Sequence, residues 1–141
     1  MPTRKASATW EGGLQSGKGS FKGESGGVGG SYTAGSRFAD QPGSNPEELL
    51  AAAHAACYSM ALSLELEKAG KPPTQVTTDA ACTVERVGEG FTITTMKLTT
   101  RATVPGIEDV EFQKLANGAK EGCPVSRALS GLKIELDARL Q

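Results

Sequence analysis

The chain contains three cysteines, Cys57, Cys82 and Cys123, and reactive sulfur is the first chemistry that its sequence suggests. Their spacing includes neither a Cys-x-x-Cys pair nor the ligand spacing of a zinc finger. An odd number of cysteines also argues against a framework of structural disulfides. We therefore expect any cysteine chemistry to be catalytic or redox-sensing.

The three cysteines differ in their surroundings. Cys57 lies among alanines in a predicted helix, where a small buried thiol is the more common role. Cys123 directly precedes Pro124 at the start of a short predicted helix, where unpaired backbone amides favour a thiolate. An inert turn residue and a reactive thiol are equally open readings of Cys123. Cys82 falls on the apolar face of a predicted strand, and we interpret it as a spectator.

Three further side chains could take part in chemistry. His54 precedes Cys57 by three residues, so the two side chains occupy neighbouring helix positions and could touch. His54 could act as a general base, although a lone buried histidine more often satisfies a local hydrogen bond. Arg37 and Glu47 could serve a reactive site, or they could be an ordinary surface ion pair and a helix-start carboxylate.

A long helix is the clearest element, and it carries Cys57. Asn45 suits the N-cap, Pro46 suits the first helical position, and Glu48 completes a variant of the capping box. Apolar residues then recur at steps of three and four until Gly70 ends the pattern. The pattern predicts a helix of about 24 residues, roughly 36 Å long, with a deeply buried alanine-rich centre.

Strand patterns dominate the rest of the chain. The other predicted elements are a hairpin with strands at 6–10 and 19–24, a loop and short strand over 31–40, strands at 76–84 and 91–104, helices at 109–120 and 124–129, and a strand at 132–140. The short strand would carry Arg37. A slip of the apolar phase between Ile93 and Met96 predicts a β-bulge. This order favours an α+β fold in which an antiparallel β-sheet packs on the long helix.

Length and composition suggest one domain over residues 1–141 that gains from self-association. Eighteen glycines and 38% hydrophobic residues leave little core material, so we expect a homodimer. Fifteen basic and sixteen acidic residues form no long blocks, which argues against nucleic-acid binding. We read no leader and no membrane span in the sequence, and we expect a cytoplasmic protein.

Four segments together resemble the OsmC branch of the OsmC/Ohr hydroperoxide-resistance family. They are ATWEGG (8–13), SRFAD (36–40), NPEELLAAAHAACYSMALSLELEKAG (45–70) and GCPVSRAL (122–129), and the resemblance extends over nearly the whole chain. It implies an intertwined homodimer with active sites at the subunit interface. It also implies a cysteine-based peroxidase that reduces organic hydroperoxides without a bound cofactor or metal. The reductant would be an external dithiol, and lipoyl proteins are the donors typical of the Ohr branch.

The resemblance assigns a role to four residues of this chain. Cys57 matches the peroxidatic thiol, Cys123 the resolving thiol, Arg37 the activating guanidinium and Glu47 its carboxylate partner. A buried thiolate needs a nearby cation, and a guanidinium oriented by a carboxylate could also stabilise the leaving alkoxide. A sulfenic acid needs a second thiol before it is over-oxidised. Cys123 is therefore expected within disulfide reach of the long helix.

Glu47 and Cys57 are separated by a rise of about 15 Å along the predicted helix. Either Arg37 and other groups bridge this distance, or Glu47 of a second subunit approaches Cys57, which the scarce core favours. Alanines, leucines, Tyr58 and Met60 near Cys57 predict an apolar approach that favours alkyl or fatty-acid hydroperoxides over hydrogen peroxide.

Two other functions are compatible with the same residues. A redox-sensing or small-molecule-binding protein would use the cysteine pair without turnover, and it would not need an arginine that polarises a peroxide. A purely structural, stress-related scaffold would need neither cysteine for its function.

Overall fold

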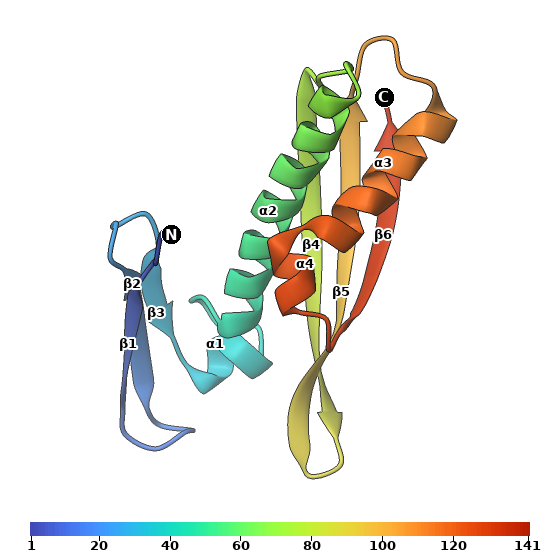
Figure 1. Cartoon of the computed structure of the whole chain (residues 1–141). Coiled ribbons are helices and arrows are strands. Elements are labelled where there is room, and N and C mark those ends of the chain that lie inside the picture. Colours follow the sequence, from blue (N-terminus) through green and yellow to red (C-terminus); the bar gives the residue numbers. More distant parts are fainter. The chain divides into compact units, whose positions relative to one another are not determined.

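The computed structural model describes the whole chain, residues 1–141, and it divides into two compact units (Figure 1). The first unit comprises Met1–Leu49 and the second comprises Leu50–Gln141. The long helix α2 (Pro46–Lys68) begins in the first unit and continues through the second. The single domain expected over residues 1–141 stays a prediction.

A three-stranded antiparallel sheet forms most of the first unit, with β1 (Ala6–Glu11), β2 (Lys18–Gly23) and β3 (Gly29–Tyr32) in that order. The hairpin expected from the sequence is therefore confirmed.

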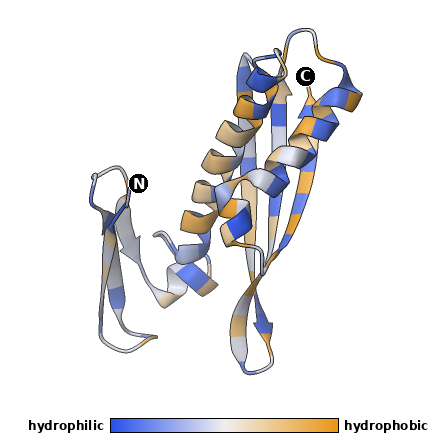
Figure 2. Ribbon diagram, viewed as in Figure 1, coloured by the Kyte–Doolittle hydropathy of each residue, from blue (hydrophilic) through white to orange (hydrophobic).

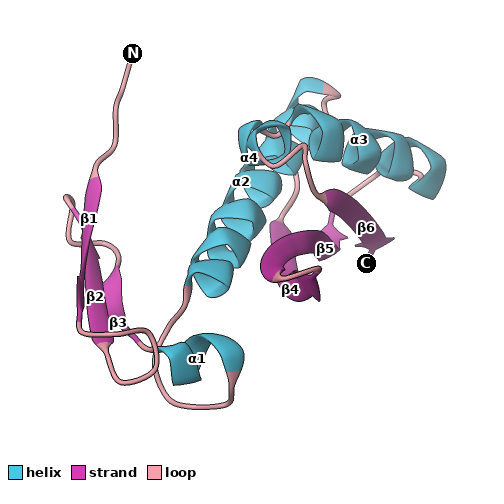
Figure 3. Cartoon of the chain, turned by 90° about the horizontal axis from the view of Figure 1, so that it is seen from below, coloured by secondary structure: helices cyan, strands magenta, loops and turns pink.

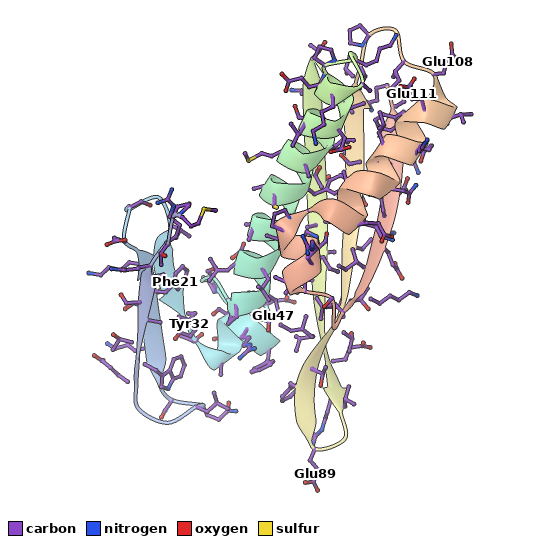
Figure 4. All side chains as sticks on the ribbon, viewed as in Figure 1. Phe21, Tyr32, Glu47, Glu89, Glu108 and Glu111 are labelled. Carbon is purple, nitrogen blue, oxygen red and sulfur yellow. The ribbon has the colours of Figure 1, made fainter.

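An aromatic cluster covers part of this sheet. The ring of Tyr32 lies 5.3 Å from the ring of Trp10 and 5.9 Å from that of Phe21, between ring centroids (Figure 4). Gly19 lies opposite both Trp10 and Tyr32 in the strand register. A Cβ atom at Gly19 would come within 2.5 Å of the Tyr32 ring, so this position has no room for a side chain.

The segment that carries Arg37 is a short helix, α1 (Ala34–Phe38), and the prediction of a short strand there was wrong. Thr33 and Ser36 form a reciprocal capping box: each side chain accepts a hydrogen bond from the backbone N–H of the other, at 2.9 and 3.0 Å. Serine here takes the place that glutamate usually has in this motif, so the signal was easy to miss.

Both ends of α2 agree with the prediction, except that the Glu48 carboxylate bonds to Ser44 rather than to the backbone of the N-cap residue. The Asn45 side chain accepts from the Glu48 backbone N–H at 2.8 Å, as expected of an N-cap. The Glu48 carboxylate accepts from the Ser44 hydroxyl at 2.6 Å. At the other end, Gly70 adopts a φ of 74° and donates to Glu67, which gives the helix a glycine stop.

Burial along α2 is one-sided, so the prediction of a deeply buried centre was wrong for the single chain. The fully buried residues recur every four positions: His54, Tyr58, Leu62 and Leu66. The opposite side of the same turns is exposed, including Ala53, Ala56 and Met60, which is 75% exposed. Figure 2 shows that α2 is largely apolar over most of its length. An apolar helix face is thus left open.

The apolar character of α2 has a second consequence. By length and composition it could cross a membrane, with a mean hydropathy of 1.4 in its most apolar stretch. The core helices of soluble proteins can be equally long and apolar. The buried side of α2 contributes Tyr58, Leu62 and Leu66 to the core of the second unit.

The second unit contains the other sheet, in the order β4 (Gln75–Val87), β5 (Gly90–Thr103), β6 (Lys133–Leu140). β4 and β5 form the expected antiparallel hairpin, with Glu89 at its tip (Figure 4). Their register shifts between Thr83 and Val84, opposite the segment where a bulge was predicted, so the bulge is confirmed.

β6 runs parallel to β5, which corrects the prediction of a purely antiparallel sheet. The connection between these strands contains two helices, α3 (Asp109–Gly122) and α4 (Pro124–Ala128), and a crossover of this kind returns the chain to a parallel strand. Both helices were predicted. The α+β class and the packing of a long helix on a sheet are confirmed.

The helices α2, α3 and α4 lie on one face of the β4–β5–β6 sheet (Figure 3). The core between them and the sheet includes Met96 and Leu98 of β5 and Phe112 and Ala116 of α3, all fully buried. This core fixes the junction of α3 and α4 against the middle of α2.

Candidate active site

Two thiols meet where the α3–α4 junction contacts α2. Cys57 lies in the middle of α2 and is half-buried, while Cys123 separates α3 from α4 and is fully buried. The Cys123 thiol donates to the Cys57 sulfur at an Sγ–Sγ distance of 2.9 Å. The expected proximity of the two sulfurs is therefore present, and only small movements separate them from a disulfide.

The surroundings of Cys57 hold its thiol in the neutral form. Burial raises the pKa of Cys57, and the contact with Cys123 raises it further. A backbone hydrogen bond with Val125, in the first turn of α4, lowers the pKa in the opposite direction. Burial is the largest of these effects. A positive charge brought to this sulfur would therefore favour the reactive thiolate.

Arg37 and Glu47 form a two-pronged ion pair in the first unit. Arg37 Nη2 donates to Glu47 Oε1 at 2.8 Å, and Arg37 Nε lies 3.1 and 3.2 Å from the two carboxylate oxygens. The Glu47 side chain is only 7% exposed, whereas that of Arg37 is 36% exposed. The guanidinium carbon also lies 5.1 Å from the centre of the Phe38 ring. The carboxylate thus holds a guanidinium that solvent still reaches.

Local hydrogen bonds bring α1 to the start of α2, and so bring Arg37 to Glu47. The buried Ser36 hydroxyl donates to the backbone carbonyl of Ser44 at 2.7 Å. The Asn45 amide donates to the backbone carbonyl of Ser36 at 3.0 Å. Asn45 therefore caps α2 and ties α1 to it, next to the residues that carry the ion pair.

A cavity of about 250 Å³ adjoins Arg37 in the first unit. Its walls are mainly apolar and aromatic: Trp10, Leu14, Tyr32, Thr33, Ala34, Arg37 and Phe38. A pocket with apolar walls and one cationic group suits a ligand that has an apolar body and a polar end.

The structure brings the four predicted site residues together as two pairs. The Cys57–Cys123 pair belongs to the second unit, and the Arg37–Glu47 pair belongs to the first. The two-pronged contact expected for Arg37 is confirmed. The catalytic roles of the four residues, and the joining of both pairs in one site, stay predictions.

Tyr58 was expected beside the approach to the sulfur, but it is fully buried and its hydroxyl donates to the Ala116 carbonyl at 3.0 Å. Its expected place in an apolar approach was therefore wrong. Cys82 is half-buried on β4, paired in register with Met96. No group of three or more His, Cys, Asp or Glu side chains is arranged to hold a metal ion.

Ser126 and Val125 were not among the site residues predicted from the sequence. Ser126 is hydrogen-bonded to His54, with 2.7 Å between Oγ and Nε2, and Val125 is the backbone partner of Cys57. One signal was present: Ser126 follows Cys123 by three residues, just as His54 precedes Cys57 by three. A hydroxyl on a short helix gives no further indication of its partner.

Comparison with known proteins shows a close and nearly full-length similarity. The family model described as OsmC-like protein matches residues 39–137. Peroxiredoxin OsmC of Escherichia coli K12 is 45% identical over 98% of this chain and 96% of its own length. An organic hydroperoxide resistance protein of Xanthomonas axonopodis pv. citri is 34% identical over 63% of this chain and 61% of its own length. The crystal structure of such a protein from Elizabethkingia anophelis superposes with a TM-score of 0.73 at 29% identity, covering 100% of this chain and 96% of the other.

Proposed function

The chain belongs to the OsmC-like protein family, and from this premise we propose that it reduces organic hydroperoxides to alcohols through a disulfide between Cys57 and Cys123. It is a cysteine-based peroxidase, as the similarity to a peroxiredoxin and to an organic hydroperoxide resistance protein indicates. The observation that carries the finer proposal is the 2.9 Å contact between the two free thiols.

In the first step the Cys57 thiolate attacks the terminal oxygen of the hydroperoxide. An S–O bond forms, the O–O bond breaks, and the alkoxide leaves and takes up a proton. Arg37 is proposed to favour the thiolate and to donate hydrogen bonds to the leaving oxygen, where negative charge develops. Glu47 holds the guanidinium by the two-pronged contact, which leaves its other N–H groups free for the substrate.

In the second step the Cys123 thiol attacks the sulfenic acid on Cys57. A disulfide forms and water leaves, so the peroxide oxygen has been fully reduced. An external dithiol then reduces the disulfide by thiol–disulfide exchange, and no bound cofactor is needed. A dithiol of the lipoyl type is the proposed donor. We expect this cycle to operate in the cytoplasm, where thiols are kept reduced.

The proposed substrates are organic hydroperoxides, with hydrogen peroxide less favoured. The support is the apolar cavity beside Arg37, whose aromatic walls suit an alkyl or acyl chain and whose guanidinium suits the peroxide end. Hydrogen peroxide has no apolar part to gain from such walls. Equal efficiency with hydrogen peroxide and cumene hydroperoxide, under the same dithiol, would contradict this preference.

We further propose that the working form is an intertwined homodimer in which Glu47 of one subunit serves Cys57 of the other. The support is the open apolar face of α2, which includes Ala53, Ala56 and Met60. Burial of this face against a second copy would remove apolar area from water. Light scattering of the purified protein tests the proposal, and Met60→Asp should shift the mass towards that of a monomer.

The decisive test of the proposed function is peroxide consumption by purified variants with cumene hydroperoxide and excess dithiol. We expect many turnovers by the wild type and by Cys82→Ser, which serves as the matched cysteine control. Cys57→Ser should consume no peroxide, because the attacking sulfur is absent. Oxidation of the wild type that stops after one equivalent would refute the enzyme proposal and indicate a redox sensor. If Cys57→Ser and Cys123→Ser both behave as the wild type does, the result would indicate a structural protein.

A further inference from the structure

A hydrogen bond between His54 and Ser126 connects α2 to α4 inside the second unit. His54 is fully buried and Ser126 is 5% exposed. Their Nε2 and Oγ atoms are 2.7 Å apart, although the residues are 72 positions apart in the chain. This is the distance of a well-formed hydrogen bond in a site that water does not reach.

The position of this hydrogen bond mirrors that of the two thiols. His54 lies three residues before Cys57 on α2, and Ser126 lies three residues after Cys123 on α4. Residues three apart on a helix are neighbours on adjacent turns. The His54–Ser126 hydrogen bond and the Cys57–Cys123 contact therefore join the same two segments about one turn apart.

The start of α4 needs a support of this kind. The helix has five residues, and Cys123 at its N-cap makes no side-chain capping bond. Its first turn nevertheless places Cys123 against Cys57 and supplies the backbone hydrogen bond from Val125 to that sulfur. Ser126 follows Val125 directly, so an anchor at Ser126 holds both contacts.

The state of the histidine ring also argues against a purely space-filling role. Burial lowers the pKa of His54, which keeps the ring neutral. Nδ1 is buried and has no hydrogen-bond partner. A buried polar atom without a partner is unfavourable, and an apolar side chain would avoid it. The contact through Nε2 is thus the feature that a histidine provides here.

We propose that His54 and Ser126 are positioning residues for the resolving step. Their hydrogen bond holds α4 against α2 while both cysteines are reduced, so that Cys123 reaches the Cys57 sulfenic acid before a second peroxide does. The inference rests on the proposed two-cysteine cycle. It deepens that cycle by naming the groups that keep the resolving thiol in place.

Two reactions compete for the sulfenic acid. In one, the Cys123 thiol forms the disulfide and releases water. In the other, a second hydroperoxide transfers an oxygen atom to the sulfur, which gives a sulfinic acid and an alcohol. The first reaction is favoured by the fixed proximity of Cys123, since it is intramolecular. Loosening α4 slows the first reaction and leaves the second unchanged.

The test measures the products at Cys57 by mass spectrometry of the digested protein, after excess cumene hydroperoxide without reductant. The wild type should give mainly the Cys57–Cys123 disulfide. Ser126→Ala and His54→Leu should raise the sulfinic fraction by about tenfold, because each removes one partner of a buried hydrogen bond. His54→Gln should return the fraction towards the wild-type value, since its amide can donate to the Ser126 hydroxyl.

Ser59→Ala is the matched control. Ser59 is also on α2, two residues after Cys57, but its hydroxyl donates to Thr78 Oγ1 of β4 at 2.8 Å. This variant loses a hydroxyl contact of similar length without releasing α4, and it should resemble the wild type. Unfolding by urea, followed in all variants, separates a local effect from a general loss of stability. If His54→Leu does not fold, Ser126→Ala provides the same test with a smaller change.

Three outcomes would overturn the proposal. The first is complete disulfide formation in folded Ser126→Ala and His54→Leu. The second is an equal rise in sulfinic acid in Ser59→Ala, which would indicate general loosening. The third is over-oxidation in His54→Gln as strong as in His54→Leu. A wild type that forms no Cys57–Cys123 disulfide would instead refute the proposed function, together with this inference.

Discussion

Replacement of Arg37 by alanine removes a guanidinium that Glu47 holds and that solvent still reaches. Arginine has five N–H donors. The Glu47 carboxylate engages the one on Nε and one on Nη2, which leaves three for a peroxide oxygen. Loss of a donor aimed at developing negative charge costs about 100- to 1,000-fold in rate, or about 2.7–4 kcal/mol. We expect a loss of this size in kcat/KM for Arg37→Ala with cumene hydroperoxide.

Glu47→Gln should have a smaller effect. The guanidinium keeps its charge, and only its orientation is weakened. Because the Arg37 side chain is 36% exposed, solvent screens the pair, and we expect a loss of about 1 kcal/mol, or about fivefold. If Glu47 acts only through Arg37, the double variant should be no slower than Arg37→Ala alone.

The assay is steady-state peroxide consumption with saturating dithiol, so that the reductive step does not limit the rate. Arg139→Ala is the matched control, because Arg139 also makes a two-pronged contact, with Asp137 at 3.3 Å, on a side chain that is 71% exposed. It should keep the wild-type rate. A value of kcat/KM for folded Arg37→Ala within about threefold of wild type would refute the role given to the guanidinium.

Three further predictions concern stability and its pH dependence. Burial lowers the pKa of His54, so the unfolded chain binds a proton more readily than the folded chain as the pH falls below about 6.5. The free energy of unfolding should therefore fall more steeply with decreasing pH for the wild type than for His54→Gln. Urea titration at several pH values between 5 and 8 measures the difference. Tyr58→Phe removes the hydrogen bond to the Ala116 carbonyl and should lower the free energy of unfolding by about 1 kcal/mol with little change in kcat, and an unchanged urea midpoint would contradict this. Gly19→Ala places a Cβ against Tyr32 and should destabilise the first unit by about 1–3 kcal/mol, seen as an earlier unfolding transition in the fluorescence of Trp10, the single tryptophan.

Local signals in the sequence were sufficient to predict most of the helices and strands. The caps and the glycine stop predicted α2, and the alternation on β4 and the phase slip on β5 predicted the hairpin and its bulge. These features depend on neighbours in the chain, which a sequence shows directly. The prediction of a strand around Arg37 was wrong because Thr33 and Ser36 form an unusual capping box. The backbone groups of this segment make the helical hydrogen bonds of α1 rather than those of a sheet.

For this protein, the sequence by itself indicated which residues are candidates for the chemistry, because thiols, a guanidinium and a carboxylate are properties of single side chains in recognisable motifs. Only the tertiary structure decided which of them meet. Cys123 contacts Cys57, and Ser126 contacts His54, although each pair is more than sixty residues apart in the chain. Tyr58 is buried in the core, whereas one face of α2 is exposed. β6 runs parallel to β5. Contacts of this kind depend on how whole helices and strands pack, and the type of one residue does not predict which distant residue it will contact.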